Sequence, residues 1–258
     1  MLPVYDQGHL GSCVDNAVAG VFHYCELRQN WSATWIPSRL FGYYWARSLY
    51  WGNTDDDNGS SVEAGVKAIA TYGTVPESQW PYDPSNLTVI PPANVMKAAA
   101  PYMISDYGRC PDNSGANIKA AVASNNPVIF GFDVYENYPQ DASTGGVIPM
   151  PAGAKQGGHA VVIVGYDDDG SLGHKGYYII RNSWGDAWGD KGYGYMPAAM
   201  VENFQYCSDF WIIASIPGGT TPTPPPPCPP SPSNQNYSQQ VLDRIDWWNR
   251  NYPRYVPR

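Results

Sequence analysis

The sequence has no apolar run long enough to cross a membrane, and it has few positive charges. No stretch approaches the about 18 consecutive apolar residues that a transmembrane helix needs, so we expect no membrane span. Lysine and arginine number 15 against 23 aspartates and glutamates, which gives a formal net charge of −8. This acidic balance argues against non-specific nucleic-acid binding, and we expect no nucleic-acid partner.

The N-terminus lacks the pattern of a secretory signal peptide. It reads Met1-Leu2-Pro3-Val4-Tyr5-Asp6, with no basic region followed by an apolar run. We therefore expect a cytosolic or virion-associated protein rather than a secreted one, unless upstream sequence was removed before Met1.

Cysteines are few and form neither CxxC pairs nor an even set. They are Cys13, Cys25, Cys110, Cys207 and Cys228. This spacing supports no zinc site, and we expect neither a metal ion nor another cofactor. If Cys13 is a nucleophile, the other four could form two disulfides or none, and the sequence leaves both open. The acidic run 55–58 lacks the full pattern of a calcium-binding loop, so a solvated loop is expected there.

Aromatic residues, glycine and proline are abundant and indicate many loops rather than a helical bundle. Aromatics make up 14% of the chain, with 26 glycines and 25 prolines. The proline-rich stretch reads as a stiff polyproline-II spacer that cannot join a core. The predicted organisation is therefore a globular domain over 1–216, a Pro-rich linker over 217–233 and a short tail over 234–258.

The tail combines tryptophans and arginines with a helical apolar face. That face consists of Val241, Leu242, Ile245 and Trp248. The alternatives are a disordered end and a segment that docks, either on a protein partner or on its own domain. A membrane surface fits less well, because Asp243 and Asp246 offset the arginines.

The hydrophobic period changes within the globular domain. Apolar residues at helical spacing predict helices over 12–28, 61–72 and 116–123. Short runs rich in β-branched and aromatic residues predict strands over 127–134, 159–166, 176–181 and 192–196. Helices first and strands later indicate an α+β protein in two lobes.

Cys13 is a candidate nucleophile because of its place at the start of the first predicted helix. A thiol attacks as a thiolate, and the unpaired N–H groups of a helix N-terminus favour that charge. The same N–H groups can donate to a developing oxyanion. At such a position the ordinary alternative is a buried structural cysteine.

A catalytic thiol needs a histidine base and a third group that orients the base. His159 follows a glycine pair and opens an apolar strand, which would hold its imidazole firmly. His23 lies on the same predicted helix as Cys13 and points elsewhere, while His174 lies in a polar loop. Asn182 ends the next strand and could fix the tautomer of the histidine.

Three segments in this order resemble the motifs of papain-like (C1) cysteine peptidases. Gln7-Gly8-His9-Leu10-Gly11-Ser12-Cys13 resembles the nucleophile motif, residues 157–166 the histidine motif, and residues 182–194 the asparagine motif. The resemblance continues through Pro76–Tyr82 and Ser208–Trp211, so it covers most of residues 1–216. In style the motifs are closest to those of microbial or viral members, with Leu10 and Val14 where a cysteine and an aromatic residue are usual.

The resemblance implies a helical left lobe, a β-barrel-like right lobe and a cleft between them that binds an extended peptide. It implies that Gln7 and the backbone N–H of Cys13 bind the oxyanion, that His159 takes the thiol proton and that Asn182 holds the imidazole. It further implies that Trp184 shields that contact. The substrate contacts carried over are Gly59, Ser60, Gly158 and Trp184.

The expected function is therefore a cysteine-type peptidase. It would hydrolyse peptide bonds of peptides or proteins by a Cys-His-Asn thiolate–imidazolium mechanism with an acyl-thioenzyme intermediate. The resemblance also leaves a second class open, because no propeptide precedes the nucleophile motif in the sequence. That alternative is a papain-fold structural or interaction protein of a virion or other assembly, anchored by its tail. A transglutaminase-like acyl transferase fits less well with the asparagine motif.

Overall fold

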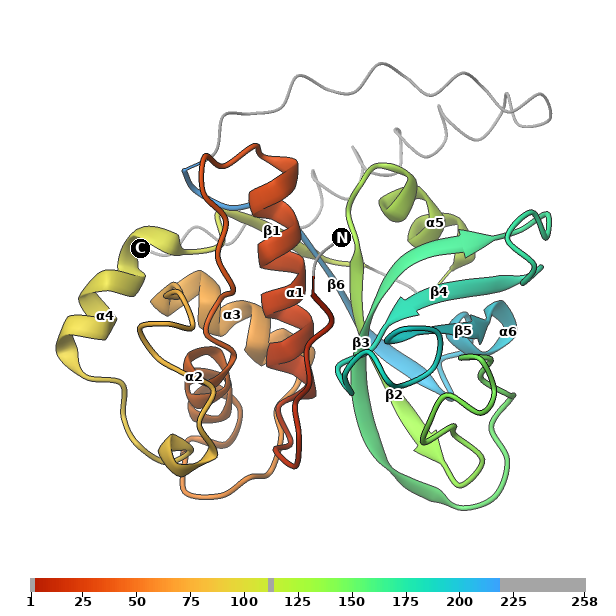
Figure 1. Cartoon of the computed structure of the whole chain (residues 1–258), viewed down its shortest axis with the longest axis horizontal. Coiled ribbons are helices and arrows are strands. Elements are labelled where there is room, and N and C mark those ends of the chain that lie inside the picture. Colours follow the sequence, from red (N-terminus) through yellow and green to blue (C-terminus); the bar gives the residue numbers. More distant parts are fainter. Residues whose placement is uncertain (1–2, 111–113, 219–258) are drawn as a thin grey trace.

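The computed structural model describes residues 3–110 and 114–218. These residues form an α+β protein in two lobes, with a group of helices on one side and an antiparallel sheet on the other (Figure 1). Most of the predicted Pro-rich linker (217–233) and the whole tail (234–258) lie outside the described residues.

The helical lobe is built from α1 to α4, and α5 and α6 lie beside the sheet. Their bounds are α1 Cys13–Arg28, α2 Arg39–Trp51, α3 Val62–Tyr72, α4 Ala93–Ala99, α5 Gly115–Ala123 and α6 Ala198–Val201, with 3₁₀ turns at Pro84–Asn86 and Ala100–Tyr102. The three predicted helices are confirmed within a residue as α1, α3 and α5. Helices α2, α4 and α6 were not predicted.

Local sequence explains where α3 begins and ends. The side chain of Ser61 accepts a hydrogen bond from the backbone N–H of Ala64, which satisfies one of the unpaired donors at the helix start. At the other end Gly73 has φ +75°, and a Cβ there would lie 1.9 Å from the carbonyl oxygen of Ala99. Only glycine fits this stop, because both its backbone angle and its close approach exclude a side chain.

The second lobe is built on a six-stranded sheet in which every neighbouring pair is antiparallel. The strands are β1 Asp106–Arg109, β2 Val128–Tyr135, β3 Lys155–Asp167, β4 Tyr177–Arg181, β5 Tyr193–Pro197 and β6 Cys207–Ser215, in the order β1-β6-β2-β3-β4-β5. The four predicted strands are confirmed as β2, β3, β4 and β5. β1 and β6 were not predicted as strands.

The middle of strand β3, residues 159–163, is buried on both faces and separates two hydrophobic cores. Ala160 and Val162 face a core shared with α1 and α3, while Val161 and Ile163 face the core of the second lobe. Successive side chains of a strand point to opposite faces, so a strand covered on both sides reads as an unbroken apolar run. This explains the sequence pattern of 159–166.

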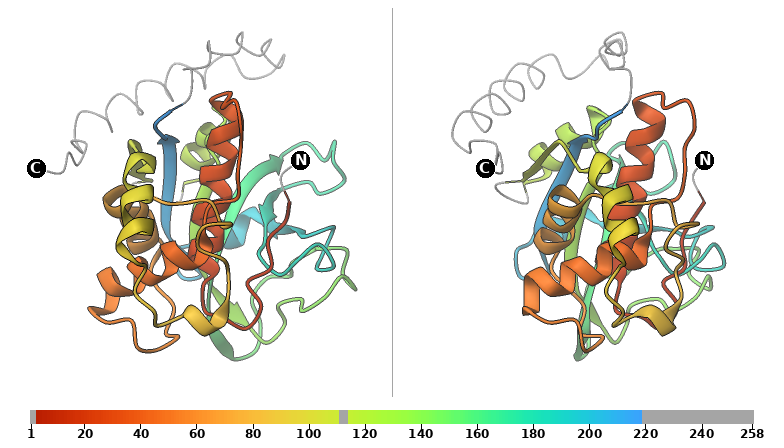
Figure 2. Two further views of the ribbon diagram at one scale, coloured as in Figure 1. Left: turned by 60° about the vertical axis from the view of Figure 1, so that its left-hand side comes forward. Right: turned by 90° about the vertical axis from the view of Figure 1, so that its left-hand side faces the viewer.

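The arrangement of α1 and the N-terminal segment brings the three sequence motifs together. Helix α1 packs against β3 (Figure 2). Its first residue, Cys13, packs on the core that contains Ala160, the residue after His159 on that strand. The N-terminal segment pairs with the chain that follows β4, through hydrogen bonds of 2.9 Å from Gln7 N–H to Ser183 O and 3.0 Å from Gly185 N–H to Tyr5 O.

Among the described residues, no helix is long and apolar enough to span a bilayer.

Candidate active site

A cleft of about 1120 Å³ lies where the two lobes meet and contains most of the candidate residues. Cys13, His159 and Gln7 all line it. So do the four candidate substrate contacts, Gly59, Ser60, Gly158 and Trp184. Asn182 does not reach the cleft wall; it is buried behind it with 1% of its surface exposed.

Hydrogen bonds around Asn182 fix the tautomer of His159. The Nε2 atom of His159 lies 2.8 Å from Oδ1 of Asn182, and the backbone N–H of Ser183 donates to the same oxygen at 2.8 Å. The atom that accepts from Ser183 must be the amide oxygen, so Nε2 of a neutral His159 must carry the proton. The Nδ1 atom is then left with its lone pair, as a general base requires.

Aromatic rings enclose the imidazole. The ring centre of Trp184 lies 4.9 Å from that of His159 at an interplanar angle of 31°, and Phe132 meets the imidazole edge-on at 5.6 Å. Burial lowers the pKa of His159 to about 4, although the hydrogen bond that His159 donates to Asn182 acts in the opposite direction. Trp184 thus lies where it can exclude water from the histidine, as the sequence resemblance implies.

Desolvation is also the largest influence on the pKa of the Cys13 thiol. It raises the pKa of Cys13 to about 11, against backbone groups of Ala160 and of the first turn of α1 that lower it. The lowering effect of the helix start, expected from sequence, is therefore present but outweighed. Cys13 keeps part of its surface open. Burial therefore favours the neutral form of the Cys13 thiol and the neutral form of the His159 imidazole. Transfer of the proton from the thiol to the imidazole would charge both groups but leave the pair with no net charge.

The side-chain amide of Gln7 is fixed by two hydrogen bonds, and one of its N–H groups remains unused. Its Oε1 accepts from the hydroxyl of Ser183 at 2.7 Å, and its Nε2 donates to the carbonyl of Leu10 at 2.9 Å. An amide nitrogen has two hydrogens, so one remains after the contact with Leu10. Ser183, a member of the asparagine motif for which the sequence indicated no role, therefore orients the side chain of Gln7.

Gly59 and Ser60 differ in their capacity to bind a substrate backbone. The N–H of Gly59 donates to the Tyr43 hydroxyl at 3.0 Å, and its carbonyl accepts from Nε1 of Trp51 at 3.0 Å. Both groups are engaged within the protein. Ser60 instead has a buried hydroxyl without a protein partner. Gly158 is exposed, and no atom lies within 4 Å of where a Cβ would stand.

Asp57 anchors the loop that precedes Cys13. It belongs to the stretch 55–58, whose four exposed residues form the solvated loop expected from the sequence. Its carboxylate accepts from the backbone N–H of Gly11 at 2.9 and 3.1 Å and from the Tyr43 hydroxyl at 2.5 Å. Within residues 3–110 and 114–218, no group of three His, Cys, Asp or Glu side chains is placed to hold a metal ion.

The remaining histidines and two of the remaining cysteines lie outside the cleft lining. His23 pairs with the Tyr5 hydroxyl at 3.0 Å, and His174 stacks on the ring of Tyr195. Cys25 and Cys207 are buried free thiols. Of the two alternatives that the sequence leaves open, two disulfides among the four non-catalytic cysteines is therefore excluded in this structure.

Comparison with known proteins places the chain in a family. Residues 51–208 match the model of the papain family of cysteine proteases. An uncharacterized peptidase C1-like protein of Acanthamoeba polyphaga mimivirus is 38% identical over 221 residues, which are 82% of this chain and 69% of that protein. The crystal structure of xylellain, a cysteine protease from Xylella fastidiosa, has 35% identity and a TM-score of 0.76, covering 83% of each chain.

A cathepsin B-like cysteine proteinase of Ostertagia ostertagi is 41% identical over 87 residues, which are 33% of this chain and 45% of that protein. The family match extends over more than half of the chain. The chain belongs to the papain family of cysteine proteases. Its α+β two-lobe fold is the papain-like fold expected from the motifs, and it is a cysteine-type peptidase.

Proposed function

We propose that this peptidase hydrolyses peptide bonds with Cys13 as nucleophile, His159 as general base and acid, and Asn182 as the group that orients His159. The observation that supports this most strongly is the contact of 2.8 Å between His159 Nε2 and Asn182 Oδ1, which leaves Nδ1 as the basic atom. Cys13 and His159 line one cleft, so a substrate carbonyl bound there would meet both.

In the first half of the reaction, Nδ1 of His159 takes the proton from Cys13 as Sγ attacks the substrate carbonyl carbon. The carbonyl π electrons move to its oxygen. The remaining Nε2–H of Gln7 and the backbone N–H of Cys13 donate to that oxyanion. When the oxyanion collapses, the C–N bond breaks and His159 returns its proton to the leaving amine, which leaves an acyl-thioenzyme.

The second half releases the acid. A water molecule gives a proton to His159 and attacks the thioester carbonyl, and the same two donors bind the second oxyanion. The C–S bond then breaks, and the proton returns from His159 to the sulfur. Because the proton stays within the pair, neither Cys13 nor His159 carries an isolated charge in the resting enzyme, which agrees with the effect of burial on each pKa.

The proposed substrate is a peptide that lies extended along the cleft. The exposed Gly158 and the region of Ser60 would meet its main chain, because no side chain blocks the approach at Gly158. The N–H of Gly59 already donates to Tyr43 and is not available to a substrate. The alternative of a purely structural protein of an assembly has no support in these contacts, because the residues around the cleft are arranged as donors and acceptors for a reaction.

Labelling with a peptidyl epoxide, read by intact mass, tests the proposal. The wild type should gain a single adduct on Cys13 rapidly, and Cys13→Ala should gain none. His159→Ala should label far more slowly because the base is missing, while the matched variant Cys207→Ala should label like the wild type. Reaction at Cys13 no faster than that of free cysteine would overturn the enzymatic mechanism and favour the structural alternative.

A further inference from the structure

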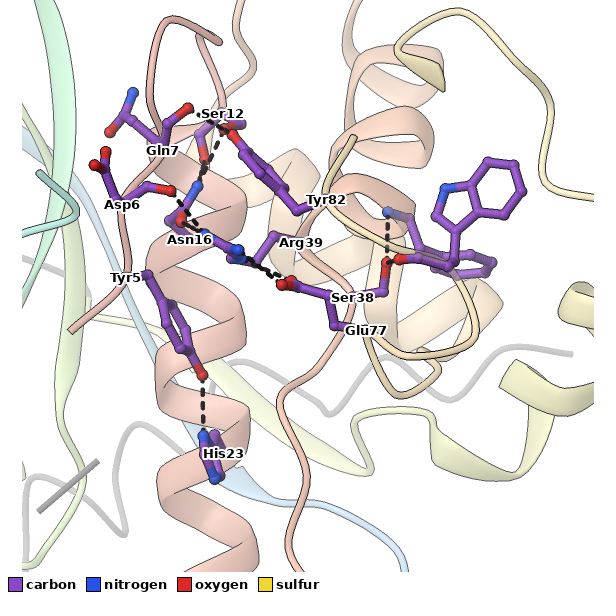
Figure 3. Close-up of polar contacts among 12 residues, drawn as sticks. Tyr5, Asp6, Gln7, Ser12, Asn16, His23, Ser38, Arg39, Glu77 and Tyr82 are labelled. Carbon is purple, nitrogen blue, oxygen red and sulfur yellow. Dashed lines mark hydrogen bonds and ion pairs between the residues drawn. The ribbon is translucent and has the colours of Figure 1, made fainter. Parts of the chain in front are cut away.

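The segment Pro76–Tyr82 carries part of the family resemblance but has no role in the chemistry derived above. Its last residue places a hydroxyl between the two halves of the nucleophile motif (Figure 3). The Tyr82 hydroxyl lies 2.8 Å from the carbonyl oxygen of Gln7 and 2.5 Å from Oγ of Ser12. These two residues are directly involved with the oxyanion donors, because Gln7 supplies one and Ser12 immediately precedes Cys13, which supplies the other.

The direction of each hydrogen bond in this group is determined by its partners. A carbonyl can only accept, so Tyr82 donates its one hydrogen to Gln7. Ser12 must then donate to Tyr82, and Nδ2 of Asn16 donates to Ser12 Oγ at 3.0 Å. Oδ1 of Asn16 accepts in turn from Nη1 of Arg39 at 3.0 Å. The result is a chain of donors that runs in one direction from Arg39 to Gln7.

The hydroxyl of Ser12 takes part in this chain of hydrogen bonds instead of capping helix α1. It stands at the N-cap position of α1, where a serine side chain ordinarily accepts from a backbone N–H of the first turn. Ser12 makes no such cap hydrogen bond. Its hydroxyl is committed to Tyr82 and Asn16 instead. Loss of a favourable cap at the residue before the nucleophile suggests that the hydroxyl has a function in the site.

An ion pair between Arg39 and Glu77 fixes the beginning of this chain of hydrogen bonds. Nε and Nη2 of Arg39 donate to the two carboxylate oxygens of Glu77, each at 2.8 Å, and Nη1 also donates to the carbonyl of Asp6 at 2.9 Å. The guanidinium lies 4.0 Å from the ring centre of Tyr82. A bidentate pair beneath a stacked ring restricts the movement of both partners.

We infer that Tyr82 is a positioning residue that fixes the separation of the two oxyanion donors, Gln7 Nε2–H and Cys13 N–H. Its hydroxyl ties the backbone of Gln7 to the side chain of Ser12, so the two donors cannot drift apart. The inference rests on the proposed roles of Gln7 and Cys13. It matters because donors stabilise an oxyanion only when they already point at the place where its charge develops.

The variant Tyr82→Phe removes the hydroxyl and keeps the ring on Arg39. For a chromogenic peptide substrate, kcat should fall about 10-fold, since displacement of a donor by a fraction of an ångström weakens transition-state binding. KM should stay within about twofold because ground-state binding is little changed. The rate at which iodoacetamide alkylates Cys13 should stay the same, because alkylation forms no oxyanion and depends on the thiol and His159 alone.

The matched control is Tyr178→Phe, which also loses a hydroxyl hydrogen bond, to Glu202 at 2.7 Å, but lies outside the cleft lining. It should keep the wild-type kcat. A second comparison places Tyr82→Phe in a Gln7→Ala background. If Tyr82 acts on the donor geometry, its loss should cost clearly less there than in the wild type, since one of the two donors is already gone.

The outcomes separate this inference from the proposed mechanism. If the wild type neither turns over peptide nor shows rapid alkylation at Cys13, the mechanism itself fails. If the wild type is active and Tyr82→Phe has the same kcat, the positioning role is wrong. Equal losses in kcat and in the alkylation rate would also overturn it, because they would indicate a general disturbance of the thiol.

Discussion

The hydroxyl of Ser183 donates a hydrogen bond of 2.7 Å to Oε1 of Gln7, although the two residues are 176 positions apart. Ser183 follows Asn182 directly, and its N–H donates to Asn182 Oδ1 at 2.8 Å. One residue therefore links the group proposed to orient the histidine to the side chain proposed to bind the oxyanion. This contact joins the asparagine motif to the nucleophile motif.

Replacement of Ser183 by alanine should reduce kcat about 10-fold, because the Gln7 amide loses the partner that sets its orientation. Oε1 of Gln7 would be left unpaired in a buried site, at a cost of about 1–3 kcal/mol in the free energy of unfolding. Steady-state kinetics and urea unfolding measure the two effects, with the exposed Ser171→Ala as control. An unchanged kcat beside a lowered stability would show that Ser183 has a structural role only.

The activity should persist to unusually low pH. Burial lowers the pKa of His159 to about 4, and protonation of His159 removes the base that the thiol needs. We therefore expect the acidic limb of the pH dependence of kcat/KM near pH 4 instead of near the ordinary histidine value of about 6.5. Measurement from pH 3 to 8, with brief exposure and a return to pH 7 to check recovery, tests this. An acidic limb near pH 6.5 would contradict the burial argument.

Loss of the Asn182 side chain should lower kcat and shift this limb in a defined direction. The hydrogen bond from His159 to Asn182 stabilises the charged imidazole and so raises its pKa. In Asn182→Ala the acidic limb should move to still lower pH, while kcat falls about 10- to 100-fold as the ring loses its orientation. A shift toward higher pH in the same kinetic assay would be inconsistent with the contact described.

Helix α3 packs closely on α1 beside Cys13, the proposed nucleophile. A substitution at Gly65 tests how tight this packing is. A Cβ added at Gly65 would lie 2.4 Å from Cγ1 of Val14, the residue after Cys13. The higher helix propensity of alanine should raise the free energy of unfolding of Gly65→Ala by about 1 kcal/mol. Overpacking against Val14 should lower it by more than this gain, since its typical cost is about 1–3 kcal/mol.

Thermal unfolding of Gly65→Ala should therefore show a lower Tm than the wild type. The control is Gly157→Ala, where a Cβ meets no atom within 4 Å and stability should change little. A Tm for Gly65→Ala equal to or above that of the wild type would show that α1 and α3 can separate without cost.

Glu26 should make folding sensitive to pH. Its side chain is fully buried, Oε1 has no partner, and burial raises its pKa to about 7. Between the ordinary carboxyl pKa of about 4.3 and this raised value, the folded state holds a proton that the unfolded state has lost. The stability contribution is complete below that range and is lost as the pH rises through about 7.

The variant Glu26→Gln removes this titration. Relative to the wild type, it should be more stable at pH 7.5 than at pH 4.5, by a difference on the order of 3 kcal/mol. Urea unfolding of both proteins at both pH values gives this difference. Because His23 and His159, whose pKa values are lowered, are present in both proteins, their opposite effect cancels. A difference that does not change with pH would contradict a raised pKa at Glu26.

The sequence predicted those elements whose apolar residues follow a single period. α1, α3 and β3 could be recognised because each buries a continuous face or both faces. Helix α2 could not, because it buries charged residues. Arg47 is fully buried and donates to the carbonyls of Thr54 and Asp56 at 2.7 and 2.9 Å. A buried arginine reads as a surface position until its partners are known.

The candidate site was predicted residue by residue but not as a network. The motifs indicated Cys13, His159, Asn182 and Gln7, and the structure brings the first two and Gln7 to one cleft with Asn182 behind it. The partner of Gln7 in the asparagine motif could not be deduced, since the contact spans 176 residues. The pKa of the thiol also differed from expectation, because sequence shows a helix start but not the burial that opposes it.

Cys13 should form an acyl-thioenzyme during turnover. This can be observed by mixing the enzyme with an excess of an activated ester substrate, quenching within milliseconds and measuring the intact mass. The expected result is a transient mass increase equal to one acyl group, located on Cys13 by peptide mapping. Cys13→Ala should show no such increase and no turnover. Turnover that proceeds without acylation of Cys13, or that survives in Cys13→Ala, would show that Cys13 is not the nucleophile.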